Sequence, residues 1–169
     1  MNLARRIALA LVFLPFAAAA QSVHNDAGSS EQIALQQIAF VHGGTGPFAV
    51  AGYRIGQRAL AELNLPRGSF SLEVVHKTPS EVQWSCIADG VQAATGASVG
   101  KLNLRLEPAS EDSTETIVRD KKSHHAVAFR LTPEFVKRYL NLPHEKLADA
   151  GKQVLTLPDD QIFSMKVVR

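Results

Sequence analysis

The chain has 169 residues, of which 46% are hydrophobic and 20% are charged, a composition typical of one globular domain. Its single cysteine excludes an internal disulfide framework and any zinc site built from several cysteines. The formal charge of +2 gives no sign of a basic surface, so we expect no nucleic-acid partner.

The first twenty residues, MNLARRIALALVFLPFAAAA, have the pattern of a secretory signal peptide. Two arginines precede an apolar stretch, and Ala18 and Ala20 fit a cleavage site before Gln21. A membrane anchor is the alternative, but it needs roughly 20 apolar residues, and this stretch is shorter and contains Pro15. We therefore expect a periplasmic or secreted protein with no stable membrane anchor.

The rest of the chain divides into a polar, flexible lead-in over residues 21–30 and a single domain over residues 31–169. In chain order, the domain is predicted to contain a helix over 31–40, a glycine-rich loop over 41–47, a helix over 48–64, a strand over 69–77, a helix over 85–95, a strand over 101–106, strands over 116–119 and 125–131, helices over 133–140 and 143–150, and a strand over 161–168.

The helix over 48–64 has the clearest pattern. Phe48, Ile55 and Ala59 mark an apolar face, and Arg54 and Arg58 mark a polar one, which predicts an amphipathic helix. Residues at the ends of the other elements support the assignment as well. They are Pro47 at a first helical position, Thr132 as an N-cap, and Gly96 and Gly151 as helix ends.

Leu102, Leu104 and Leu106 alternate with polar residues and predict one buried strand face. Helices and hairpin-like strands are interspersed irregularly along the domain. We therefore predict an α+β fold with a mixed or antiparallel sheet packed against several helices.

Cys86 is the first candidate for chemistry. It has two interpretations: a small buried apolar residue, or a thiolate near a helix N-terminus that acts as a metal ligand or nucleophile. Asp89 follows three residues later, so both side chains fall on nearby faces of the predicted helix. His76 lies near a strand end and is expected to approach the Cys86 segment after the intervening turn.

His42 opens the glycine-rich loop, VHGGTGP, and a helix N-terminus follows the loop. Glycines allow a ligand to approach the backbone closely, although the spacing fits neither a Walker A motif nor a dinucleotide-binding fingerprint. His124 and His125 are adjacent, and in a strand they would point to opposite faces, so we interpret them as part of a solvated turn.

Two segments together resemble the FmdE family of formylmethanofuran dehydrogenase proteins. The first, HGGTGPFAVAGYR at residues 42–54, is similar to a family pattern H-G-H-x-C-P-x-x-x-x-G-x-R. The second, SCIADGVQAATGASVGKLNL at residues 85–104, is similar to S-C-x-x-D-G-x-Q-x-x-T-G-x-T-x-G-K-x-N. The order and spacing agree, and the resemblance covers about residues 38–131. It implies an FmdE-like α+β domain with a pocket between the two segments.

The resemblance also implies a metal site, which the chain matches only in part. The metal-site positions of the family fall on His42, Gly44, Gly46 and Cys86. His42 and Cys86 match, whereas glycines replace a second histidine and a cysteine. Zinc sites use three or four protein ligands, so Asp89 or His76 would have to supply a third. The implied cofactor is zinc or another transition metal.

We weigh three functions. The first is an exported FmdE-like domain that binds a small molecule or a transition metal near His42, Cys86 and Asp89, with the family metal site partly lost. Lys101 and Asn103 would line or brace that pocket, or would instead stabilise a helix-to-strand turn. The second is an enzyme with Cys86 as nucleophile and His42 or His76 as base. The third is a non-catalytic scaffold that forms a homodimer.

Overall fold

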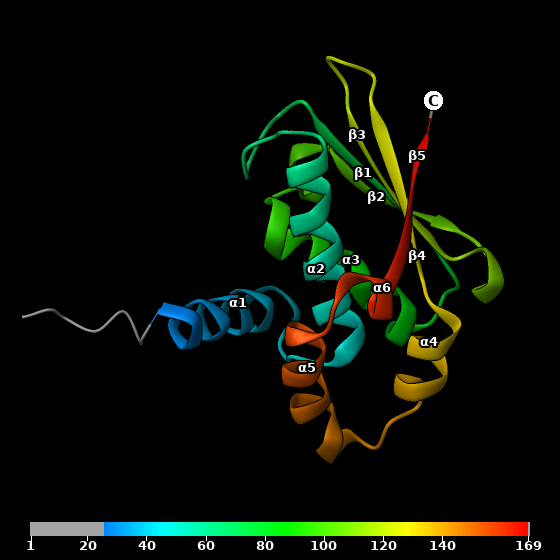
Figure 1. Ribbon diagram of the computed structural model, residues 1–169. Coiled ribbons are helices and arrows are strands. Elements are labelled where there is room, and N and C mark those ends of the chain that lie inside the picture. The colour runs from blue at the N-terminus through cyan, green and yellow to red at the C-terminus, as the bar shows by residue number, and fades with distance from the viewer. Residues whose placement is uncertain (1–25, 169) are drawn as a thin grey trace, which may run out of the picture.

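The computed structural model describes residues 26–168 (Figure 1). The predicted signal peptide at residues 1–20 and the first half of the predicted lead-in lie outside these described residues. The second half of the lead-in is helical, because the first helix, α1 (Asp26–His42), begins five residues earlier than the apolar pattern predicts.

The described chain is an α+β domain, as predicted, with six α-helices and one five-stranded sheet. The elements are α1, α2 (Pro47–Glu62), β1 (Leu72–Thr78), α3 (Val82–Thr95), β2 (Leu104–Pro108), β3 (Glu115–Asp120), β4 (Ala126–Leu131), α4 (Pro133–Tyr139), α5 (Leu147–Thr156), α6 (Asp159–Ile162) and β5 (Phe163–Val168). Within the described part, no helix is both long and apolar enough to cross a membrane.

The sheet is mixed, with strand order β2-β1-β3-β4-β5. β1 and β2 are parallel and are connected through α3, whereas the other three pairs are antiparallel. The parallel pair aligns Val74 with Leu104, and the next pair aligns Val74 with Val118. All three residues are buried on the face that α2 and α3 cover (Figure 1).

The opposite face of the sheet is charged. Cross-strand ion pairs join Glu73 to Arg105 at 2.8 Å and Glu115 to Arg130 at 3.1 Å. Lys166 on β5 also lies 3.2 Å from Glu115. These pairs keep one face of the sheet polar while the other faces the core, which is the usual arrangement of a sheet that contacts water on one side.

The helix α2 is buried on almost every side, which the sequence pattern does not indicate. Phe48, Ile55 and Ala59 are buried as predicted, and so are Val50 and Tyr53 on other sides of the helix. The polar face expected for α2 is therefore narrow. One of its residues, Arg54, has a side chain only 18% exposed.

Two sequence predictions are wrong in detail. Gly151 does not end a helix but lies inside α5, where a Cβ atom would come 1.7 Å from the backbone oxygen of Thr45. Close packing, and not a turn, therefore explains this glycine. Of the three leucines only Leu104 is buried. Leu102 is exposed because it lies in the 3-10 turn before β2, at φ 54°, whereas the exposed Leu106 lies within β2, the edge strand of the sheet.

Candidate functional site

The side chains of His42 and Asp89 form a hydrogen bond that joins α1 to α3. His42 is the last residue of α1, and its Nδ1 lies 2.9 Å from Oδ2 of Asp89 on α3. An ionised carboxylate only accepts hydrogen bonds, so Nδ1 carries the hydrogen and donates it. In the neutral ring this leaves a lone pair on Nε2, which has no hydrogen-bond partner among the described residues.

Cys86 lies one helical turn before Asp89 on α3. Its side chain is almost completely buried, and Sγ donates a weak hydrogen bond to the backbone oxygen of Gln83 at 3.1 Å. Burial raises the pKa of the Cys86 thiol to about 12, with the nearby Asp89 carboxylate as a second cause in the same direction. The group is therefore a neutral thiol near pH 7.

A pocket of about 270 Å³ connects His42 and Cys86. It is hollowed between the N-terminal ends of α2 and α3 and the segment that follows α4. Most of its wall is apolar, with His42, Gln83 and Cys86 as the polar members; the lining residues are His42, Gly46, Pro47, Phe48, Val82, Gln83, Cys86, Leu142 and Leu147. Mainly apolar walls with a few polar groups are typical of small-molecule sites.

Two glycines bring α2 and α3 close enough to form this pocket. A Cβ atom on Gly52 would lie 2.0 Å from the backbone oxygen of Ile87, and one on Gly90 would lie 1.9 Å from that of Ala49. The two helices therefore touch backbone to backbone. This contact fixes the position of Cys86 and Asp89 relative to the start of α2.

The donor set does not fit a tightly held metal ion. In residues 26–168, no group of three or more His, Cys, Asp or Glu side chains is placed to hold one. His42 and Cys86 are two donors, and Asp89 is engaged with His42. Structural zinc sites are four-coordinate, and catalytic ones keep three protein ligands.

His76 does not reach this pocket. It lies on β1, is 1% exposed, and both ring nitrogens are engaged. Nε2 donates to the backbone oxygen of Trp84 at 3.1 Å, and Nδ1 accepts from the hydroxyl of Thr116 at 2.9 Å. Burial lowers the pKa of His76 to about 4, so the ring is neutral near pH 7.

Lys101 and Asn103 lie beyond the other end of α3 and do not line the pocket. Cys86 and Gly96 are ten residues apart, which is about 15 Å along a helix. Lys101 Nζ donates to the backbone oxygen of Gly96 at 2.8 Å, and Asn103 Oδ1 accepts from the backbone N–H of Ser98 at 2.9 Å. Both residues stabilise the turn from α3 to β2, in agreement with the alternative interpretation.

Comparisons with known proteins identify the family of the chain. A family model described as FmdE, molybdenum formylmethanofuran dehydrogenase operon, matches residues 41–164. The chain belongs to the FmdE family. The FmdE match reaches further toward the C-terminus than the two motif segments and includes α4, α5 and the start of the last strand.

A solved structure with a similar fold is a tungsten formylmethanofuran dehydrogenase FmdE-like protein from Syntrophus aciditrophicus. The TM-score is 0.57 at 20% sequence identity, and the match covers 82% of this chain and 72% of that chain. At this identity the similarity establishes the FmdE-like fold. A comparison with curated proteins found no match.

Sequence reasoning missed part of the pocket wall. Gln83, Leu142 and Leu147 have no motif around them, and the last two lie in a connection and at the start of a helix whose bounds differ from the prediction. Their place at the pocket depends on how the segment after α4 folds back over α2 and α3. No local pattern in the sequence carries that information.

Proposed function

We propose that this FmdE-like domain binds a small organic molecule in the pocket between His42 and Cys86. The observation that carries the proposal is that His42, whose imidazole is oriented by Asp89, lines a pocket of about 270 Å³ with mainly apolar walls. A ligand that fits has a compact apolar body and one hydroxyl group. That group would donate a hydrogen bond to Nε2 of His42.

The hydrogen bond with Asp89 supports this role for His42. It holds the ring in one orientation and fixes the hydrogen on Nδ1, so the same acceptor nitrogen is always presented. Apolar side chains such as Phe48 and Leu147 would contribute most of the binding free energy through burial. Gln83 also lines the pocket, and its amide is held by hydrogen bonds with the backbone of Tyr139 and Asn141.

A cysteine-dependent enzyme is less well supported. A nucleophilic cysteine needs a thiolate, and the raised pKa of Cys86 opposes its formation. His76 cannot act as its base, because Thr116 and Trp84 engage both ring nitrogens. Iodoacetamide at pH 7.5 is therefore expected to alkylate native Cys86 far more slowly than a free cysteine. Alkylation at or above the rate of free cysteine would restore this alternative.

A tightly bound metal is the second alternative, since His42 and Cys86 keep two positions of the family metal site. The matched variants are His42→Ala and Cys86→Ala in residues 21–169. We expect the parent to take up far less than one zinc ion per chain. Near-stoichiometric zinc in the parent that both variants lose would overturn the organic-ligand proposal in favour of a metal site.

The direct test uses NMR on the 15N-labelled protein with a panel of small alcohols, phenols and carboxylic acids. We expect at least one compound class to shift amides of residues 42–48, 82–86 and 147 together. His42→Ala should weaken that binding about tenfold, as the loss of one hydrogen bond to a ligand implies. Shifts confined to other surfaces would contradict the proposal.

We also propose export, on the strength of the first twenty residues alone. The positive start, apolar stretch and small residues at the cleavage site support it. N-terminal sequencing of protein expressed with its own leader is expected to begin at Gln21. A chain recovered with Met1 intact from the cytoplasm would contradict export.

A further inference from the structure

One wall of the pocket belongs to a segment in which most side chains are exposed or only half-buried. Residues 142–157, here called the lid, leave α4, turn, and return as α5 over α2 (Figure 1). The lid places Leu142 and Leu147 on the pocket. From α5, only Ala150, Gly151 and Val154 are buried.

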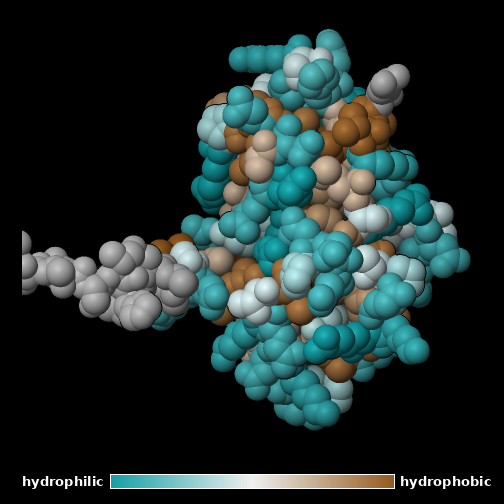
Figure 2. Space-filling view, viewed as in Figure 1, coloured by the Kyte–Doolittle hydropathy of each residue, from teal (hydrophilic) through white to brown (hydrophobic). Residues whose placement is uncertain are grey.

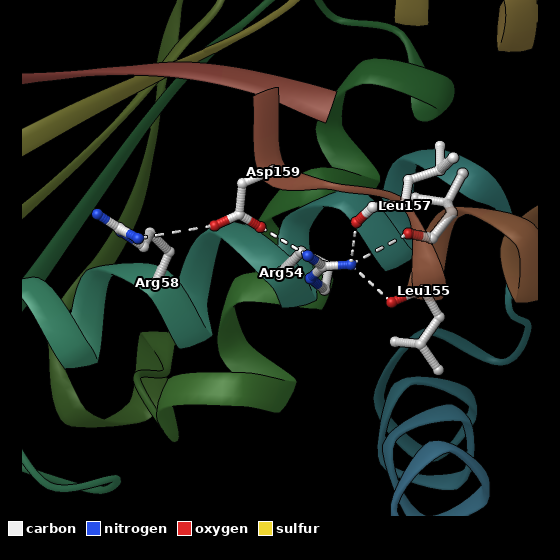
Figure 3. Close-up of polar contacts among 6 residues, drawn as sticks. Arg54, Arg58, Leu155, Leu157 and Asp159 are labelled. Atoms are coloured by element: carbon white, nitrogen blue, oxygen red, sulfur yellow. Dashed lines mark hydrogen bonds and ion pairs between the residues drawn. The ribbon is translucent and has the colours of Figure 1, made fainter. Parts of the chain in front are cut away.

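The far end of the lid is held by one side chain of α2. Figure 3 shows the guanidinium of Arg54 in contact with the end of α5. Its Nη1 donates to the backbone oxygens of Leu155 at 2.6 Å and Leu157 at 2.8 Å, with that of Val154 at 3.4 Å. Its Nη2 pairs with Asp159 at 2.6 Å. A cation at a helix C-terminus is also favoured by the helix dipole.

The near end of the lid is held by a pocket residue. Gln83 Nε2 donates to the backbone oxygen of Tyr139, and the backbone N–H of Asn141 donates to Gln83 Oε1, both at 3.2 Å. Asn141 itself has a positive φ of 58°, which marks a sharp change of chain direction there. The lid therefore has a polar attachment at each end, and between them only Ala150, Gly151 and Val154 are buried against the domain.

The elements on either side of the lid are much more firmly held. Phe135 and Tyr139 of α4 are buried, with Phe135 against Phe48, and Ile162 after the lid is fully buried. A segment with few buried apolar contacts between two such anchors opens at a lower free energy than the domain unfolds. Its opening would remove Leu142 and Leu147 from the pocket and expose Cys86.

We propose that residues 142–157 form a lid that controls access to the pocket, and that the Arg54 contacts keep it closed. The inference rests on the proposed function in one respect, since it takes the pocket as the site that the lid serves. Arg54 acts as a positioning residue here, because it touches the lid and not the pocket.

The single cysteine provides the test. Closed molecules shield the Cys86 thiol, so N-ethylmaleimide modifies it only after opening, and the labelling rate measures the open population. Arg54→Met and Asp159→Ala are expected to accelerate labelling at least tenfold in the absence of denaturant. Low urea should change these rates little, because a local opening exposes little surface. Hydrogen exchange should rise at residues 147–157 but not in α3.

Arg130→Met is the matched control. Arg130 also pairs with a carboxylate, Glu115, and donates to a backbone oxygen, that of Asp112, but it lies on the charged face of the sheet. We expect unchanged labelling in this variant. Three results would each overturn the lid proposal. They are equal acceleration of labelling in Arg130→Met, rapid labelling of the parent protein, and labelling rates that rise steeply with urea, as global unfolding predicts.

This experiment contains no ligand, so its outcome is separate from that of the proposed function. A lid that opens over a pocket that binds none of the panel compounds would leave the lid in place and remove the function. If a panel compound binds but Arg54→Met does not change the labelling rate, the proposed function stands and the lid is overturned.

Discussion

At the scale of single residues, hydrogen bonds distinguish His42, which keeps one ring nitrogen without a partner, from His76, which uses both. Asp89 engages Nδ1 of His42, and Nε2 has no hydrogen-bond partner among the described residues. Thr116 and Trp84 use both nitrogens of His76 in the core. Residue type alone makes both histidines candidates, and only their partners distinguish a pocket residue from a structural one.

The glycines at two family metal positions give a prediction at this scale. Nothing lies within 4 Å of a Cβ atom built on Gly44 or Gly46, and neither has a positive φ. The double substitution Gly44→His and Gly46→Cys should therefore fold. It adds two donors to those of His42 and Cys86, and three or four donors make a tight zinc site.

We expect zinc uptake to rise from well below one ion per chain to near one, measured by elemental analysis after dialysis. Gly44→Ala with Gly46→Ala is the control that changes the same backbone positions without adding donors. Equal zinc in both variants, or no zinc in either, would show that these positions do not converge with His42 and Cys86.

At the scale of elements, the crossing of α2 and α3 positions the pocket. Gly52→Ala would place a methyl group against the backbone oxygen of Ile87, and a backbone atom cannot rotate away as a side chain does. Overpacking of this kind costs about 1–3 kcal/mol, and more where the backbone has to move. The better helix propensity of alanine, roughly 1 kcal/mol, offsets only part of that cost.

The expected result for Gly52→Ala is a net loss of at least about 1 kcal/mol in the free energy of unfolding, measured by urea denaturation. Gly44→Ala serves as the comparison, since its Cβ meets open space, and it should leave stability within roughly 0.5 kcal/mol. If both substitutions had the same effect, close helix contact would not be the reason for glycine at position 52.

At the scale of the whole molecule, His76 ties the stability of the domain to pH. Its pKa is lowered by burial to about 4 in the folded state, against an ordinary value of 6.5. As the pH falls from 6.5 to 4, the unfolded chain binds a proton that the folded chain resists, so stability decreases through this window. Above pH 6.5 this contribution is complete.

The full shift corresponds to about 3 kcal/mol, of which a large part should be lost between pH 7 and pH 5. Urea unfolding at those two values measures it, and His76→Gln should reduce the difference. Glu115 and Asp120 have lowered pKa values, so they lose their contribution only below about pH 4.5 and do not obscure this window. A parent protein equally stable at pH 7 and pH 5 would contradict the argument.

The assembly state belongs to the same scale. Ile33 and Phe40 on α1 are 52% and 92% exposed, although Figure 2 shows mainly hydrophilic residues with small separate apolar patches on the face in view. Neither observation tests whether two copies associate, so the homodimer expected from the sequence stays a prediction. Light scattering on the purified protein measures it.

Local patterns in the sequence are sufficient for most of the fold. The α+β class, the helix that begins at Pro47, the end of α3 at Gly96 and the Thr132 cap each depend on residues close together in the chain, and the structure confirms them. The hydroxyl of Thr132 indeed accepts the backbone N–H of Phe135 at 3.1 Å. Such contacts need no knowledge of distant segments.

The motif residues also place the core of the candidate site. His42, Cys86 and Asp89 are candidates on sequence grounds and meet in space. The sequence cannot show that Asp89 orients His42, that burial keeps Cys86 protonated, or that Lys101 and Asn103 belong to a turn. Each of these properties depends on residues that other elements bring within contact distance.

What only the tertiary structure decided is the packing between segments far apart in the chain. The sequence predicts that Gly151 ends a helix, and it instead lets α5 touch the backbone of Thr45. Arg54 belongs to the polar face of its predicted helix, and it instead binds the end of α5 about a hundred residues later. The sequence by itself determined the type and order of most helices and strands, because helix hydrogen bonds, helix caps and the alternation of apolar residues along a strand are local. The pocket wall and its lid depend on which surfaces meet, and that is decided only when the whole chain is folded.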